Sequence, residues 1–193
     1  MKNLAILVSG GGSNLQSIID ECKSGILKDL AQVCLVVSNN PGAFALERAK
    51  KENIAAICIN RRNYSNEIDF NSDILKELKL AKTDIICLAG YMRLLGQNIV
   101  SEYSGRILNM HPALLPKFGG QGMYGHFVHE AVIKSGEKKS GATVHFVNER
   151  YDDGKIIIQR EVPVLENDAP ETLAKRVLEI EHKIYPEAIR KII

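Results

Sequence analysis

The chain has 193 residues, of which 45% are hydrophobic and 25% charged, and its formal net charge is +2. This balance is typical of a globular protein, and we expect residues 1–193 to form a single domain. The near-neutral net charge gives no case for a nucleic-acid surface, which would need basic residues clustered on one face. No apolar stretch approaches the roughly 20 residues that span a bilayer. Four cysteines spaced singly favour reduced thiols, and therefore a cytoplasmic protein.

Short apolar runs alternate with helical patterns along the first half of the chain. Strands are predicted at residues 3–8, 32–39, 54–60, 83–90 and 105–110, and helices at residues 13–25, 41–53 and 65–82. The strands are continuous apolar runs, as a parallel sheet covered on both faces requires. The alternation predicts an α/β fold with a doubly wound, mostly parallel, Rossmann-like sheet.

The second half of the chain has a different pattern. Residues 111–125 are rich in glycine and proline and predict a long loop, and residues 126–136 predict a short helix. Residues 141–164 predict two extended segments joined by a turn at Asp152, Asp153 and Gly154. The tail predicts a final helix that Pro186 should kink or restart.

A glycine-rich stretch, "VSGGGSNLQ", lies where the first strand turns into the first helix. Backbone N–H groups at a helix start bind anions, and glycines let an anion come close. The dinucleotide fingerprint fails because Leu15 occupies a glycine position, and a P-loop lysine is absent. A smaller anion, such as a sugar phosphate, fits the stretch. A tight turn with Ser13 or Asn14 as the helix N-cap explains it equally well.

Asn109 and His111 stand two apart at the end of a predicted strand, so their side chains should point the same way. Ligands of open α/β sheets bind at that carboxyl end, and Pro112 should hold His111 extended. An amide there can donate to a developing oxyanion, and an imidazole can move protons. Asp152 or Asp153 could supply a carboxylate to the histidine, although Asp-Asp-Gly is also ordinary turn chemistry.

The remaining histidines give weaker signals. His126 and His129 have the spacing of metal ligands, but no third ligand is evident and we expect no metal. His145 lies inside a predicted strand and is interpreted as a structural residue. His182 and Glu181 lie within the last helix, where a solvated face is the default interpretation.

Five motifs, taken together, indicate a family. "LVSGGGSNLQ", "LAGYMRLL", "ILNMHPALLP", "TVHFVNERYDDG" and "EIEHKIYPEAI" follow one another along nearly the whole chain. With these motifs the chain closely resembles the folate-dependent formyltransferases, and its Gly-Ser-Asn start resembles the glycinamide ribonucleotide branch. The resemblance implies formyl transfer from 10-formyltetrahydrofolate to the amine of glycinamide ribonucleotide, in purine (IMP) biosynthesis. Tetrahydrofolate would be the second product, and no metal would be needed.

The resemblance also implies residue roles. Asn109 and protonated His111 would stabilise the oxyanion of a tetrahedral intermediate, and Asp152 would support His111 and position a water. The ribonucleotide is expected at Gly12, Ser13, Asn14 and Glu181, and the folate at Met92, Arg93, Leu94, Leu95 and Asn109. The N-terminal half would thus bind the phosphate, while the C-terminal half would contribute the folate site and the catalytic loop.

One departure and two rival functions accompany the resemblance. The loop from Lys117 to Gly125 is longer and richer in glycine than the family usually carries, so it could reshape the amine pocket. Formyl transfer to initiator methionyl-tRNA and hydrolysis of formyltetrahydrofolate would need further domains, which a chain of this extent is not expected to have. A non-catalytic phosphate-binding module would need only the glycine loop. We expect small-molecule partners, no nucleic acid or membrane, and a monomer or weak homodimer.

Overall fold

The computed structural model describes residues 1–193 as two compact units. We call Met1–Leu108 with Ile193 the N-terminal unit, and Asn109–Ile192 the C-terminal unit. The strands are β1 (Lys2–Val8), β2 (Ala31–Ser38), β3 (Ala56–Cys58), β4 (Ile85–Leu88), β5 (Ile107–His111), β6 (Lys139–Phe146) and β7 (Ile156–Pro163). The helices are α1 (Ser13–Ser24), α2 (Phe44–Lys51), α3 (Glu67–Leu80), α4 (Gln97–Glu102), α5 (His126–Lys134) and α6 (Pro170–Ile192), with a 3₁₀ turn at Arg61–Asn63.

The strands follow the hydrogen-bonding order β3-β2-β1-β4-β5-β6-β7. Strand β1 pairs in parallel with β2 and β4, and β2 pairs in parallel with β3, whereas β6 and β7 are antiparallel. The predicted α/β class with a mostly parallel sheet is therefore confirmed. The expectation that the whole chain is a single domain stays a prediction.

In the N-terminal unit, β1 and β4 are the buried strands. Every residue of β4 is buried, as are the last five residues of β1, because helices cover both faces of a parallel sheet. Helix α1 presents Leu15, Ile18 and Ile19 to this core. The apolar runs predicted as strands and the apolar spacing predicted as a helix are thus the residues that build the core.

Three features of the N-terminal unit differ from the prediction. Strand β3 has three residues, because it is outermost in the order, pairs only with β2, and exposes Ala56 and Cys58. Helix α2 begins at Phe44 rather than residue 41, because Asn40 Oδ1 accepts a hydrogen bond from the Gly42 N–H (3.0 Å) and holds a turn there. The six-residue α4 was not predicted, since so short a helix has little apolar periodicity.

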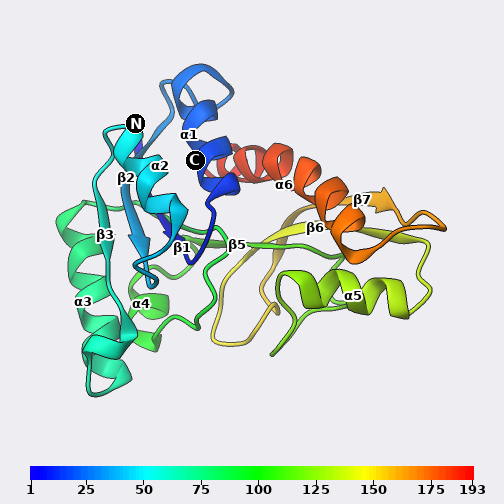
Figure 1. Cartoon of the computed structure of the whole chain (residues 1–193). Coiled ribbons are helices and arrows are strands. Elements are labelled where there is room, and N and C mark those ends of the chain that lie inside the picture. The colour runs from blue at the N-terminus through cyan, green and yellow to red at the C-terminus, as the bar shows by residue number, and fades with distance from the viewer. The chain divides into compact units, whose positions relative to one another are not determined.

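In the C-terminal unit, β6 and β7 form a hairpin on which α6 lies, with α5 beside α6 (Figure 1). Helix α6 buries Leu173, Val177 and Ile184. Pro186 does not restart this helix, which runs unbroken to Ile192. The single backbone hydrogen bond that Pro186 removes is tolerated within a heavily buried stretch. None of the helices combines the length and the apolarity needed to cross a bilayer.

His129 is a buried ionisable group on α5. Its side chain is 5% exposed, and its Nδ1 has no hydrogen-bond partner. Burial lowers the pKa of this imidazole to about 4, and the nearby His126 and His111 act in the same direction. His129 is therefore neutral in the folded protein over most of the range in which an unfolded histidine would be charged.

We expect His129→Leu to flatten the loss of stability in acid. Between pH 6.5 and about 4 this histidine is protonated in the unfolded state but neutral in the folded state. The free energy of unfolding therefore falls as the pH falls through this window. Removing the imidazole should recover roughly 3 kcal/mol of that loss by pH 4. Urea unfolding at pH 7 and pH 4.5 measures the difference. The exposed His126→Gln is the matched control, and an unchanged pH dependence in His129→Leu would contradict the assignment.

Candidate active site

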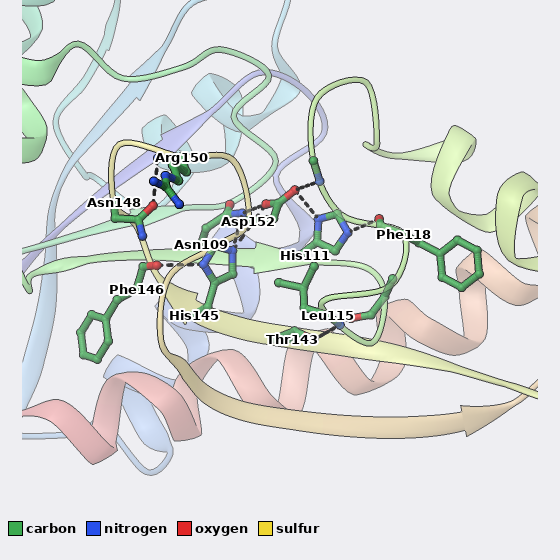
Figure 2. Close-up of polar contacts among 12 residues, drawn as sticks. Asn109, His111, Leu115, Phe118, Thr143, His145, Phe146, Asn148, Arg150 and Asp152 are labelled. Carbon is green, nitrogen blue, oxygen red and sulfur yellow. Dashed lines mark hydrogen bonds and ion pairs between the residues drawn. The ribbon is translucent and has the colours of Figure 1, made fainter.

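The predicted polar pair lies at the end of β5, at the start of the C-terminal unit (Figure 2). His111 is buried and Asn109 is half-buried. The chain beyond this strand is fixed by Thr143 on β6, whose Oγ1 donates to the Ala113 carbonyl (2.6 Å) and accepts from the Leu115 N–H (3.2 Å). A buried hydroxyl on the neighbouring strand therefore sets the exit from β5 that Pro112 was expected to stiffen.

Asp152 is the carboxylate that joins the pair. Its Oδ1 accepts a long hydrogen bond from Asn109 Nδ2 (3.4 Å), and its Oδ2 lies 3.5 Å from His111 Nδ1. Asp153 instead is exposed, with its Oδ2 3.5 Å from Asn148 Nδ2 and 3.9 Å from Arg150. The structure thus separates two candidates that the sequence left open, and only Asp152 reaches the histidine.

The turn that carries Asp152 has an unusual backbone. Asp152 has φ 51°, in the left-handed region that aspartate tolerates better than most residues. Two residues later, a Cβ added to Gly154 would lie 1.7 Å from the Phe146 carbonyl oxygen. The Asp-Asp-Gly sequence therefore forms the turn and also directs the Asp152 carboxylate toward Asn109 and His111.

The hydrogen bonds of His111 define its tautomer. Its Nε2 lies 2.8 Å from the Phe118 carbonyl oxygen, which can only accept, so Nε2 carries a hydrogen. Burial lowers the pKa of His111, although the charge of Asp152 and the Phe118 carbonyl act to raise it. The free protein therefore holds His111 mainly as the neutral Nε2–H form at pH 7, with Nδ1 facing Asp152.

Asp152 is ionised at neutral pH. Burial acts to raise its pKa, but the His145 and His111 imidazoles when protonated, together with the Gly120 N–H, outweigh burial, and the pKa is lowered. The Gly120 N–H donates to Asp152 Oδ2 at 2.9 Å. A negative charge thus stands beside His111, where it can support a transient imidazolium.

The glycine-rich loop after β5 contacts this site directly. It supplies the Phe118 carbonyl to His111 and the Gly120 N–H to Asp152. A Cβ on Gly119 would lie 2.6 Å from Leu115 Cδ2 and 3.2 Å from Asp152 Cβ. The glycine-rich loop therefore lies against His111 and Asp152, and Gly119 is needed there for close packing.

In the N-terminal unit, the glycine loop begins α1 without a side-chain cap. The N-cap is Gly12, with φ 72° and ψ 34°, and no side chain caps the helix. The alternative in which Ser13 or Asn14 caps the helix is therefore wrong. Gly12 also packs against α2, because an added Cβ would lie 2.7 Å from Ala45 Cβ. Both the backbone angle and the close contact require glycine.

Arg48 on α2 stabilises this loop, although no pattern in the sequence points to this residue. Its Nε donates to the Gly11 carbonyl at 2.8 Å, and the Ala45 N–H donates to the Gly10 carbonyl at 3.1 Å. With two carbonyls held against α2, the loop has a defined backbone conformation at the start of α1. A guanidinium beside it adds positive charge, which also favours an anion.

The segment predicted to line a folate pocket follows β4 and is linked to the end of β1. The Met92 N–H donates to Ser9 Oγ at 2.8 Å, so this segment and the glycine loop lie at the same edge of the N-terminal unit. Met92 and Leu94 are half exposed, whereas Leu95 is buried. The Tyr91 hydroxyl and Arg93 Nε are buried without hydrogen-bond partners, which marks the segment as unsatisfied in the free protein.

The remaining predicted site residue, Glu181, lies on α6 and is 8% exposed. The interpretation of Glu181 as part of a solvated face is therefore wrong, because α6 turns this carboxylate inward with its apolar stripe. His126 and His129 belong to no group of three or more side chains able to hold a metal ion. His145, interpreted as structural, lies in contact with Asn109 and Asp152.

A half-buried amide and carboxylate beside a buried imidazole, at the end of a strand in a mostly parallel α/β sheet, are groups able to catalyse a group transfer. The sequence model of the formyl transferase family matches residues 2–189, and the chain belongs to that family.

Three relatives show which members of the family this chain resembles in sequence and structure. The chain is 43% identical over 192 residues to the chloroplastic phosphoribosylglycinamide formyltransferase of Arabidopsis thaliana, spanning 65% of that protein. It is 40% identical over 192 residues to the trifunctional purine biosynthetic protein adenosine-3 of Drosophila melanogaster, spanning 14% of it. The crystal structure of glycinamide ribonucleotide transformylase 1 from Geobacillus kaustophilus is 41% identical, with a TM-score of 0.91 over 100% of this chain and 98% of that one.

We expect Asp152→Asn to move the titration of His111 to lower pH. The substitution removes the charge that acts to raise the His111 pKa, while burial, which lowers it, remains. The His111 ring proton, followed by NMR across pH 4 to 8, reports the midpoint, and the exposed His126 in the same spectra is the reference. A midpoint equal to or above that of the wild type would mean that Asp152 does not act on His111.

We expect Gly154→Ala to lower the free energy of unfolding by about 1–3 kcal/mol, because the turn has to move to admit the methyl group. Gly42→Ala is the matched control, since its Cβ would meet only Asn40 Oδ1, at 3.6 Å. Guanidinium unfolding compares the two variants with the wild type. Equal stability of both variants would show that the turn tolerates a side chain at Gly154.

Proposed function

We propose that this chain transfers the formyl group of 10-formyltetrahydrofolate to the amine of glycinamide ribonucleotide, giving formylglycinamide ribonucleotide and tetrahydrofolate in purine (IMP) biosynthesis. The observation that carries the proposal is the cluster in which Asp152 lies within 3.5 Å of both Asn109 and His111. Relatives of that name that match nearly the whole chain support the choice of substrates.

The reaction needs a donor for an oxyanion and a route for one proton. The substrate amine attacks the formyl carbon, the new C–N bond forms, and the carbonyl electron pair moves to oxygen. Asn109 and His111 then stabilise that oxyanion. To do so, the His111 Nε2–H gives up its hydrogen bond to the Phe118 carbonyl and donates to the oxyanion. The bond from carbon to the folate nitrogen breaks, and the amine proton passes to that nitrogen, with Asp152 supporting His111 and holding the water that relays it.

Other residues would hold the substrates. The ribonucleotide phosphate would bind Gly12, Ser13 and Asn14, where the helix start supplies backbone N–H donors. Glu181 would accept hydrogen bonds from the ribonucleotide. The folate would bind along Met92–Leu95 and at Asn109, and the buried, unpaired Tyr91 hydroxyl and Arg93 Nε fit a polar ligand there. Each step uses groups of this chain, without a metal.

The two halves of the chain would have different roles in the reaction. The N-terminal half would bind the phosphate, and the C-terminal half would contribute to the folate site and carry the catalytic loop, within one formyltransferase domain. We further propose a cytoplasmic enzyme, which the four free cysteines support. It would work on small molecules as a monomer or weak homodimer.

We expect His111→Ala to lower kcat by at least about 100-fold, because it removes an oxyanion donor and the group that Asp152 supports. The measurement is a spectrophotometric assay of folate product, with glycinamide ribonucleotide and a 10-formyl folate. Lys2→Gln, which changes an exposed residue at the amino end of β1, away from the strand ends that carry the predicted site residues, should keep wild-type kcat. A wild type that releases the folate product without the amine would be a hydrolase, and a wild type that formylates methionyl-tRNA instead would have the other rival activity. Either result would overturn the proposal.

A further inference from the structure

His145 lies on β6 at an irregular point of the hairpin. The β6–β7 register pairs Val144 with Ile158 and His145 with Ile156, so the ladder passes over Ile157. Such bulges occur beside active sites, where they redirect a side chain. The imidazole of His145 is buried and points toward Asn109 and Asp152 (Figure 2).

The hydrogen bonds of His145 define a single tautomer. Its Nδ1 lies 2.8 Å from the Phe146 carbonyl oxygen, which can only accept, so Nδ1 carries the hydrogen of the neutral ring. The other nitrogen, Nε2, is then an acceptor. It lies 3.2 Å from Asn109 Nδ2, an amide nitrogen that can only donate. The backbone of β6 thus makes His145 an acceptor for Asn109.

This acceptor determines which way the Asn109 carboxamide faces. A carboxamide that rotated by half a turn would place its oxygen against the lone pair of His145 Nε2 and against the Asp152 carboxylate. Both contacts would be repulsive. With Nδ2 directed at His145, the second amide hydrogen lies toward Asp152 Oδ1, in a contact of 3.4 Å at the long end of hydrogen bonding. Because this contact is long, the second amide hydrogen is the one that Asn109 can donate to a stronger acceptor such as an oxyanion.

The same geometry keeps His145 from competing with His111 for Asp152. Because His145 Nε2 carries no hydrogen, its contact of 3.5 Å with Asp152 Oδ1 is not a hydrogen bond in the neutral ring. The other carboxylate oxygen, Asp152 Oδ2, lies beside His111 and accepts a hydrogen bond from the Gly120 N–H. The two histidines therefore have opposite tautomers and different tasks around one carboxylate.

We propose that His145 is a positioning residue for the formyl transfer, which holds the Asn109 carboxamide with its nitrogen toward the oxyanion site by accepting one amide hydrogen. The inference rests on the proposed function. It assigns His145 no contact with a substrate and no proton transfer, so its effect on catalysis passes through Asn109.

The kinetic test is a double-mutant cycle. We expect His145→Phe, which keeps a ring but removes the acceptor, to lower kcat by about 10- to 100-fold with little change in KM, as expected for a misplaced catalytic group. In an Asn109→Ala background the same substitution should have almost no further effect. His145→Gln returns an acceptor oxygen near the Nε2 position and should restore most of kcat. His126→Phe, which changes an exposed histidine of the C-terminal unit, should leave kcat within about twofold, since its side chain faces solvent and Glu171.

Two outcomes would overturn the assignment. One is a full loss of kcat from His145→Phe in the Asn109→Ala background, which would give His145 a role of its own. The other is wild-type kcat in His145→Phe. If His145→Phe does not fold, the comparison of His145→Gln with wild type, alone and in the Asn109→Ala background, answers the same question.

A measurement without turnover separates this inference from the proposed function. Long-range ¹H–¹⁵N NMR of the wild-type chain with labelled histidine should show His145 protonated at Nδ1 and His111 at Nε2. A His145 protonated at Nε2 could not accept from Asn109, and would overturn the positioning role. If the wild type formylates no glycinamide ribonucleotide while His145 shows the Nδ1–H form, the proposed reaction fails and the orientation of Asn109 stands.

Discussion

A charged carboxylate in a largely enclosed place has to be surrounded by donors, and Asp152 imposes that requirement on the C-terminal unit. The Gly120 N–H and the Asn109 amide donate to it, and His111 lies beside it. These groups come from β5, from the loop after it, and from the turn between β6 and β7, so the carboxylate joins segments that are far apart in the sequence. The left-handed backbone at Asp152 is maintained because it places the charge among these donors.

Much of the fold and part of the site could be predicted from the sequence, and the physical reasons are plain. Continuous apolar runs identify buried parallel strands wherever helices cover both faces. The period of two along β5 predicts that Asn109 and His111 act on one side. What local patterns cannot supply is the identity of a partner across the hairpin. The choice between Asp152 and Asp153 depends on which side chain the turn directs at β5. His145 has the same apolar neighbours in the sequence as any structural histidine of a strand.

Arg48 and Glu181 illustrate two further limits of sequence patterns. Arg48 is an ordinary helix residue in the sequence, and its importance comes from the Gly11 carbonyl that happens to face it. Glu181 falls among charged neighbours on α6, which suggests a solvated face, yet the helix is rotated so that this carboxylate is buried with Leu173 and Val177. Both depend on how an element is rotated against its neighbours, which packing determines and periodicity describes only to within a residue.

The shift in the β6–β7 register at His145 limits how the length of β7 can change. Side chains alternate between the two faces of a strand, so one extra residue reverses the facing of everything on one side of it. Ile157 is that extra residue, and Asp152 lies on the side that would be reversed. Deleting Ile157 would make a more regular hairpin and turn the Asp152 turn toward the opposite face. The number of residues between Asp152 and the regular part of β7 is therefore constrained independently of their chemistry. Insertions and deletions there are costly in a way that substitutions of the same isoleucines are not.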